Sequence, residues 1–226
     1  MKRPEVDYRH LRLSNITSPE YRHVLLLLGW VFYFVMYFLT ENLIPYEACH
    51  LIHSPLDDLV PFCEYFAVFY VFWYVLVFGS LLYYFFYDVE SFRRLQIFII
   101  VTQVVAMAVY IIYPSCQDMR PEVVPRDNFL SHVMAYIYSF DTPTGICPSL
   151  HVGYSLGILS VCWKDKRAPL PWKAAVFILV ILISMSTAFV KQHSVVDILA
   201  AVPLGLLAEI VAYSRSYWLP KLKKRA

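Results

Sequence analysis

Charged residues are scarce in this sequence. Asp, Glu, Lys and Arg make up 16% of its 226 residues, hydrophobic residues make up 59%, and the mean hydropathy is +0.55. Soluble domains carry roughly 25% charged residues and about 45–50% apolar ones. The shortage of charge therefore excludes an ordinary soluble domain and predicts an integral membrane protein. The formal net charge of +2 indicates no particular partner, and we expect no nucleic-acid partner.

The cysteines lack the spacing of a metal site. None of the five belongs to a CxxC motif or to a Cys/His cluster, and an odd number cannot pair completely. They are Cys49, Cys63, Cys116, Cys147 and Cys162. We therefore expect no metal, no cofactor and no disulfide framework.

A cleavage site and an internal repeat are also missing. Basic residues precede the first hydrophobic run, as in a signal peptide, but residues 40–42 (Thr-Glu-Asn) make a poor cleavage site. We therefore interpret the run as a retained span. Transporters often contain repeats and polar groups at the membrane midplane. Here only Glu209 interrupts a span, and we expect it to be paired or to reach the interface.

Long apolar runs are what the sequence has in plenty. A membrane helix needs about 20 mostly apolar residues. Six segments meet or approach that length: residues 24–40, 65–87, 95–113, 148–163, 174–190 and 194–214. The fourth is short. The predicted fold is an all-α, polytopic bundle of six transmembrane helices, whose oligomeric state the sequence does not indicate.

The basic residues lie mostly on one side of these spans. Sixteen of the 19 fall in the two terminal tails and in the second and fourth loops. Cytoplasmic segments are enriched in Lys and Arg, so both termini are predicted to be cytoplasmic. Loops 41–64, 114–147 and 191–193 then face outward and hold the other three, Arg120, Arg126 and Lys191. The predicted organisation is a cytoplasmic tail (1–22), a membrane domain (23–217) and a basic tail (218–226).

Ionisable groups gather at the outward ends of the spans, where they are costly and indicate a functional site. Arg120, in "QDMRPE", has a planar fork of donors suited to phosphate. Ser149 and His151, in "CPSLH", open the fourth span, and a helix start attracts anions. Taken alone, Arg120 is more often an ordinary loop arginine, and His151 is more often an interfacial histidine. Their predicted location on one side of the membrane favours a shared site.

The stretch "KQHSVVD" adds Lys191, His193 and Asp197. His193 and Asp197 are four residues apart and share one helical face. A carboxylate on one ring nitrogen fixes the tautomer and leaves the other nitrogen to react. A His–Asp pair with a purely structural role would show the same spacing.

The first outward loop also carries acidic residues. Asp57, Asp58 and Glu64 could bind a cation or repel anionic headgroups. We favour a solvated loop, because proline and paired aspartates suit a turn before the second span.

At these residues the chain resembles the type-2 phosphatidic acid phosphatase superfamily of membrane lipid phosphatases. The family motifs KxxxxxxRP, PSGH and SRxxxxxHxxxD read here as YPSCQDMRP (113–121), PSLH (148–151) and STAFVKQHSVVD (186–197). The spacing is kept in all three motifs, and the resemblance covers the last four spans, about half the chain. Tyr113, Leu150 and Thr187 replace the family's Lys, Gly and Arg. Two phosphate-binding cations are thus missing, for which Lys191 and Arg126 are candidate replacements.

The resemblance implies a mechanism. His193 attacks phosphorus, Asp197 supports its ring, and His151 protonates the leaving oxygen. Arg120, Lys191, Ser149 and Leu150 would hold the phosphoryl oxygens, with Tyr113, Arg126 and Thr187 as further candidate positions. The active site would face the extracytoplasmic side. The expected substrate is a membrane lipid phosphate or pyrophosphate, of the phosphatidic acid, phosphatidylglycerol phosphate or undecaprenyl pyrophosphate type.

Two alternatives remain open. The motifs PSLH and KQHSVVD also resemble a sub-branch with inositol phosphorylceramide and sphingomyelin synthases, which transfer a headgroup to a lipid alcohol instead of water. A membrane protein without enzymatic activity, such as a transporter or channel, is the other alternative.

Overall fold

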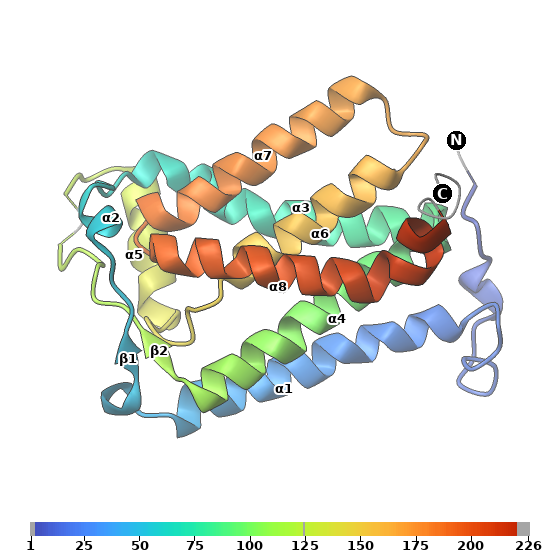
Figure 1. The fold of residues 1–226 in the computed structure, drawn as a ribbon, viewed down its shortest axis with the longest axis horizontal. Helices are drawn as coiled ribbons and strands as arrows, with labels where there is room; N and C mark the ends of the chain where they lie inside the picture. The colour runs from blue at the N-terminus through green and yellow to red at the C-terminus, as the bar shows by residue number, and fades with distance from the viewer. Residues whose placement is uncertain (1–2, 124, 221–226) are drawn as a thin grey trace.

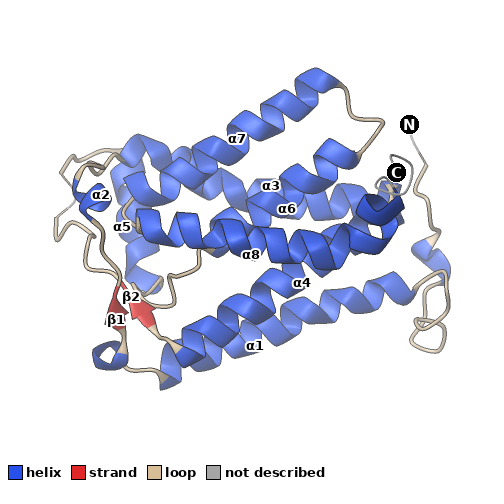
Figure 2. Ribbon diagram, in the orientation of Figure 1, coloured by secondary structure: helices blue, strands red, loops and turns tan. Residues whose placement is uncertain are grey.

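The chain is almost entirely helical in the computed structural model, which describes residues 3–123 and 125–220 (Figures 1 and 2). Its α-helices are α1 (Leu28–Leu43), α2 (Pro55–Asp58), α3 (Ala67–Tyr87), α4 (Val89–Ile112), α5 (Phe129–Phe140), α6 (Leu150–Lys164), α7 (Leu170–Phe189) and α8 (Val195–Tyr213). Short 3-10 turns cover Tyr8–His10, Arg22–Leu27, Tyr46–Ala48 and Glu64–Phe66, and a π-helical turn covers Ser214–Trp218. Two short strands are β1 (His50–Leu51) and β2 (Ser115–Cys116). The predicted all-α membrane fold is confirmed.

Five helical segments in the described residues are long and apolar enough to cross a membrane. They are Arg22–Leu43, Glu64–Tyr87, Val89–Ile112, Leu170–Phe189 and Val195–Trp218. The fourth predicted span corresponds to α6, which has only 15 residues. At 1.5 Å per residue it is about 22 Å long, which is short for a span. Because α6 packs against α4, α7 and α8, its neighbours bury most of its surface.

The third span begins earlier than the sequence predicted. Asp88 is the N-cap of α4, and its carboxylate accepts a 3.0 Å hydrogen bond from the Ser91 amide. Capping of this kind satisfies a donor that the first helical turn leaves free. Arg93 and Arg94 therefore belong to α4 and not to a loop, and Asp88 alone separates α3 from α4.

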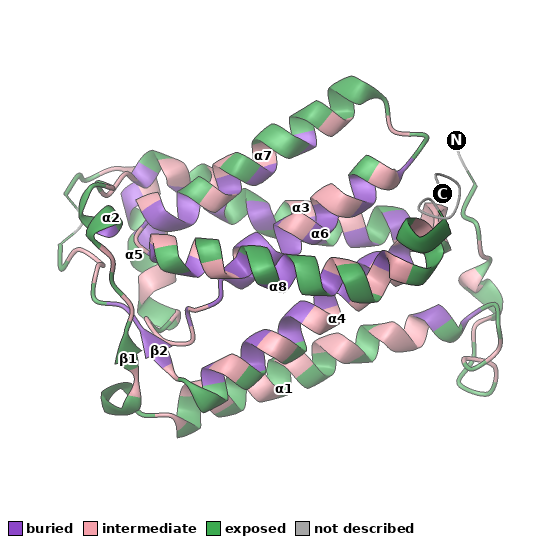
Figure 3. Ribbon diagram, in the orientation of Figure 1, coloured by how far each residue is buried: buried purple, intermediate pink, exposed green. Residues whose placement is uncertain are grey.

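The core of the bundle lies around α4. Figure 3 shows buried positions concentrated on α4 and on the facing sides of α6 and α8. Leu95, Ile99 and Ala106 of α4 are fully buried. Gly157 allows α6 to approach α4 closely, because a Cβ atom there would lie 2.7 Å from the Phe98 ring. A larger residue at 157 would force the two helices apart.

Glu209 is paired, as the sequence predicted. Its carboxylate lies 2.6 Å from the Lys164 ammonium and accepts hydrogen bonds from Ser160 Oγ and Trp218 Nε1. These contacts are at the end of the bundle where the described residues begin and end (Figure 1). Glu209 thus ties α8 to α6, which is a structural role.

The opposite end of the bundle gathers the predicted outward loops. Figure 1 shows α2, α5, β1 and β2 together at this end, with the starts of α6 and α8. The strands pair in parallel, with His50 opposite Ser115, and so join loops 41–64 and 114–147. Both ends of the described chain lie at the other end. This agrees with an even number of crossings, and the cytoplasmic location of the termini stays a prediction.

The helix α5 was not expected within loop 114–147. Asn128 caps it, accepting a 3.0 Å hydrogen bond from the Ser131 amide. Met134 is fully buried in a cluster with Tyr70 and Val190. This apolar contact, and not length, stabilises α5 against the end of the bundle.

The predicted domain boundaries at residues 22 and 218 stay predictions. Residues 1–2 and 221–226, which include the lysines of the basic C-terminal tail, lie outside the described residues.

Candidate active site

His193 and Asp197 form a buried pair at the start of α8. His193 Nδ1 lies 3.3 Å from Asp197 Oδ2. The same carboxylate oxygen accepts a 2.8 Å hydrogen bond from the Ser194 amide, while Ser194 Oγ accepts one from the Val196 amide. This reciprocal capping fixes the first turn of α8. Because Nδ1 faces the carboxylate, Nε2 is the ring nitrogen left for chemistry.

His151 lies opposite this pair, in the first turn of α6. The ring centroids of His151 and His193 are 5.7 Å apart. Tyr70 and Trp73 of α3 lie against the His151 ring, with centroids 4.5 and 4.1 Å away. The Nε2 atom of His151 is buried and has no hydrogen-bond partner among the described residues.

Ser149 joins the two helix starts. Its backbone N–H donates a 3.1 Å hydrogen bond to the carbonyl oxygen of Asp197. Its hydroxyl is the N-cap of α6 and accepts a 3.5 Å hydrogen bond from the Val152 amide. The residue is fully buried, so it orients the helix starts and does not offer its own side chain outward. The first-turn N–H groups of Leu150 and His151 have no acceptor within the helix.

Arg120 reaches the same region from the segment after β2. Its Nη1 donates to the Asp141 carbonyl at 2.6 Å, and its Nη2 donates to the Thr142 carbonyl and to Gln192 Oε1. The guanidinium also lies over the Tyr138 ring, 4.8 Å from its centroid. In the described part of the chain, the buried Nε atom has no partner. The fork is thus held rigidly, with the Nε donor still unused.

Asp141 and Gln192, which the sequence analysis did not identify, complete this network. Asp141 Oδ2 lies 3.6 Å from Arg120 Nη2 and accepts a 2.8 Å hydrogen bond from Gln192 Nε2. Burial raises the pKa of the Asp141 carboxyl, although the charge of Arg120 opposes that rise. For Gln192, the only signal in the sequence was its position next to His193 in "KQH". Asp141 had no such signal.

Asp57 was predicted to lie in a solvated loop, and its contact with the start of α8 was not predicted from the sequence. It is buried, and its carboxylate accepts hydrogen bonds from Ser194 Oγ at 2.6 Å and from the Val195 amide at 2.7 Å. Glu64 is buried as well, whereas Asp58 is exposed and pairs with His53. The expectation of a solvated loop is therefore wrong for Asp57 and Glu64, because the loop folds onto α8 and α5. It is right for Asp58.

Lys191 and Arg126 lie away from the histidines. Lys191 has a positive φ of 52°, and its ammonium donates to the carbonyls of Asp57 and Val60. Arg126 Nε pairs with Glu64 at 3.0 Å. Neither lines the cavity that His151 and His193 share. The structure does not place these two cations where the missing motif cations would act.

The three positions that depart from the family motifs have distinct surroundings. Leu150 lines the cavity. Thr187 is fully buried, and its carbonyl accepts hydrogen bonds from the amides of Gln192 and His193. Tyr113 is about half exposed and stacks on His50 at 4.1 Å. Of the three, only Leu150 reaches the cavity, and Thr187 shapes the turn before His193.

One cavity of about 990 Å³ receives the polar groups. Arg120, Asp141, His151, Gln192 and His193 line one end of it, and apolar side chains, most of them from α1 and α3, line most of the rest. Its volume is at the upper limit of roughly 300–1,000 Å³ for ligand pockets. Among the described residues, no group of three or more His, Cys, Asp or Glu side chains is placed to hold a metal ion.

Comparisons with known proteins give limited similarity. No protein-family model matches the sequence. The chain is 36% identical over 74 residues to an uncharacterized protein, MJ0662, of Methanocaldococcus jannaschii, and the match covers 33% of this chain and 29% of that protein. The chain is also similar to the crystal structure of Aquifex aeolicus LpxE, with 18% identity, a TM-score of 0.49, and coverage of 80% of this chain and 93% of LpxE. Neither comparison specifies a reaction for this chain.

Proposed function

We propose that this chain is an integral membrane phosphatase that hydrolyses a phosphate monoester or pyrophosphate of a membrane lipid. In this proposal His193 is the nucleophile, Asp197 holds and stabilises its ring, His151 is the acid and base, and Arg120 binds the phosphoryl group. The site lies near one end of the bundle, where a lipid would present its headgroup. The predicted topology puts that end on the extracytoplasmic side.

Two unused nitrogen atoms at one cavity carry the proposal. Arg120 Nε and His151 Nε2 are both buried and have no partner among the described residues. Both residues line the cavity that His193 lines. A buried polar atom without a partner costs about 1–3 kcal/mol. This cost is removed where a ligand supplies the missing hydrogen bonds. A phosphoryl group offers acceptors to both an arginine and a protonated histidine.

The reaction would proceed in two displacements. His193 Nε2 forms a bond to phosphorus as the bond from phosphorus to the leaving oxygen breaks, and His151 gives that oxygen a proton. A water molecule then gives a proton to His151 and attacks phosphorus, the N–P bond breaks, and phosphate leaves. Asp197 offsets the positive charge on the phosphorylated ring. Both steps depend mainly on positioning and charge stabilisation.

The anion would be held mostly by Arg120 and by the start of α6. The first-turn N–H groups of Leu150 and His151, together with the helix dipole, favour negative charge at this position. Asp141 would oppose it when ionised. Burial favours the neutral form of Asp141, which reduces that repulsion.

Purified protein given a labelled lipid phosphate tests the proposal. We expect free phosphate to appear with the wild-type chain and to be lost with His193→Ala. His132→Ala is the matched control, since His132 is exposed on α5 and, among the described residues, pairs with Asp127 away from the cavity. Undiminished release by His193→Ala would refute the mechanism.

The same assay separates water from an alcohol as the acceptor. We expect free phosphate without any added alcohol. If phosphate appears only in a new phospholipid, and only when diacylglycerol or ceramide is present, the enzyme is a phosphotransferase instead.

A further inference from the structure

The cavity continues far beyond the polar site. Along α3 its wall runs from Tyr70, beside His151, to Phe86 near the other end of the bundle. Sixteen residue steps along a helix correspond to about 24 Å. The hydrocarbon core of a bilayer is about 30 Å thick, so one leaflet provides roughly half of that. The cavity is therefore a groove longer than one leaflet, polar at one end and apolar along the rest.

The groove opens sideways between α1 and α3. Both helices pack against α4, but in the described residues they do not pack closely on each other. Phe34 of α1 and Phe78 of α3 line the groove and are also 59% and 67% exposed. A hydrocarbon chain could therefore enter from the bilayer while its headgroup reaches the polar end.

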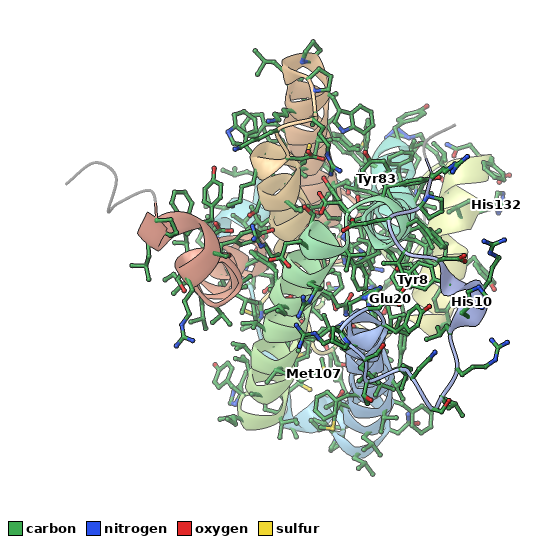
Figure 4. All side chains as sticks on the ribbon, turned by 90° about the vertical axis from the view of Figure 1, so that its right-hand side faces the viewer. Tyr8, His10, Glu20, Tyr83, Met107 and His132 are labelled. Carbon is green, nitrogen blue, oxygen red and sulfur yellow. The ribbon has the colours of Figure 1, made fainter. Side chains whose placement is uncertain are left out.

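The N-terminal segment packs behind the far end of the groove. Tyr8 stacks on Phe85 with centroids 4.7 Å apart, and its hydroxyl donates to the Phe85 carbonyl at 2.9 Å. The same hydroxyl hydrogen-bonds to Nε2 of buried His23, whose ring meets Phe92 edge-on. Phe85 and Phe92 both line the groove. Figure 4 looks onto this end of the molecule, with Tyr8 beside the end of α3 that Tyr83 marks.

A second set of bonds fixes this segment in place. The Glu5 amide donates to the Phe86 carbonyl at 2.7 Å, and the Glu5 carboxylate accepts a 2.8 Å hydrogen bond from the Val89 amide. The floor of the groove is thus built from residues about 80 positions apart in the sequence. Its depth is determined by side chains and not by the open bilayer.

We propose that the groove binds the tail of a single-chain phosphate lipid, of the long polyprenyl type, and that the floor at Phe85, Phe92 and Tyr8 selects its length. This proposal rests on the proposed function, because the headgroup would be the phosphate that His193 attacks. A groove of about 24 Å is longer than the half-bilayer that each acyl chain of a phospholipid spans, which favours one long chain. The tail must pass the membrane midplane to fill the groove.

The test compares substrates of graded length in one detergent. Geranyl, farnesyl, geranylgeranyl and undecaprenyl pyrophosphates are assayed beside dioleoyl phosphatidic acid. We expect kcat/KM to rise by about tenfold or more from geranyl to geranylgeranyl, because each added isoprene unit buries several more carbons. We expect phosphatidic acid to be poorer than geranylgeranyl pyrophosphate. Equal kcat/KM across all lengths, or a preference for phosphatidic acid, would overturn the proposal.

Leu82→Trp blocks the groove at depth. Leu82 lines it and is partly exposed, so the larger ring can be accommodated. We expect about a tenfold loss with geranylgeranyl pyrophosphate and less than about twofold with geranyl pyrophosphate. Leu207→Trp is the control, because Leu207 is similarly exposed on α8 but lies off the groove. The same loss in both variants, or at every chain length, contradicts the assignment.

Tyr8→Ala tests the floor. Removing the ring that supports Phe85 should deepen the groove. We expect the ratio of kcat/KM for undecaprenyl pyrophosphate to that for geranylgeranyl pyrophosphate to rise by about threefold or more. An unchanged ratio, in a variant that melts as the wild type does, refutes the role of the N-terminal segment.

Binding distinguishes this proposal from the proposed function. Thermal unfolding of His193→Ala is followed with the same series of lipids. Stabilisation that grows with chain length and is lost when Leu82→Trp is added supports the groove, even if no lipid is hydrolysed. Stabilisation independent of length overturns it.

Discussion

The carboxylate of Asp57 accepts a 2.6 Å hydrogen bond from the hydroxyl of Ser194, although 137 positions separate the two residues. Ser194 in turn donates its backbone N–H to Asp197, the partner of His193. The first outward loop is thereby connected to the candidate nucleophile through three consecutive contacts. Asp57 is best described as a positioning residue, since it touches neither histidine.

Asp57→Asn should weaken both folding and activity. The amide nitrogen would face the donors of Ser194, Val195 or Ser54, and one of them would lose its acceptor. A buried donor left unpaired costs about 1–3 kcal/mol of stability. We expect a lower melting temperature and about a tenfold lower kcat, with KM nearly unchanged. Asp58→Asn is the matched control and should alter neither; equal effects in both variants would remove the positioning role.

Asp197→Asn should reduce kcat by about 10²–10⁴-fold, in the range of general acid–base contributions. The asparagine can still cap Ser194 but cannot stabilise a charged His193 ring. The loss should be in kcat more than in KM, because the carboxylate acts on the charge that develops during the reaction. A variant that folds normally and keeps more than about a third of its activity would contradict this role.

Arg120→Lys should impair phosphate binding despite keeping the charge. The ammonium cannot reproduce the fork that contacts Asp141, Thr142 and Gln192 while leaving Nε free. We expect KM for the lipid phosphate to rise by about tenfold or more, measured by steady-state phosphate release. Arg126→Lys removes an arginine that pairs with Glu64 away from the cavity, so KM should stay within about twofold. Similar changes in the two variants would argue against Arg120 as the anion site.

The pH dependence of substrate binding should reflect Asp141. Burial raises the pKa of its carboxyl, so the folded protein keeps this proton to a higher pH than the unfolded chain does. As pH rises through that pKa, a negative charge appears beside Arg120 and repels the phosphate. We expect KM to increase over this interval and the increase to be absent in Asp141→Asn.

The same shift has a consequence for stability. Because the folded state binds more protons here, the contribution of Asp141 to the free energy of unfolding falls as pH rises between the unfolded and folded pKa values. Urea unfolding of the wild type and of Asp141→Asn at several pH values measures this difference. A wild-type pH profile of KM and stability identical to that of the variant would exclude Asp141 as the titrating group.

Local patterns in the sequence predicted the parts of the site that depend on local structure. The four-residue spacing of His193 and Asp197 became a helical contact, and the serine before Leu150 became the cap of α6. The apolar runs predicted the helices because burial in a bilayer depends on composition and length. The start of α4 was misplaced because a single aspartate could cap it directly after α3.

Contacts between distant loops could not be predicted in this way. Asp57 approaches Ser194, and Asp141 approaches Gln192, only because the folded bundle brings three loops to one end. Lys191 is two residues from His193 in sequence, but its positive φ turns the side chain toward Asp57. Such outcomes depend on tertiary packing and backbone geometry, which no spacing rule encodes.

Trapping of a phosphorylated protein tests the central claim most directly. Wild type, His193→Ala and His132→Ala are mixed with a lipid pyrophosphate labelled in its terminal phosphate, quenched within milliseconds, and the label on the protein is located by peptide mapping. We predict an acid-labile, base-stable phosphate on His193, retained in His132→Ala and absent from His193→Ala. Turnover without any labelled protein, or label that persists in His193→Ala, would contradict the account.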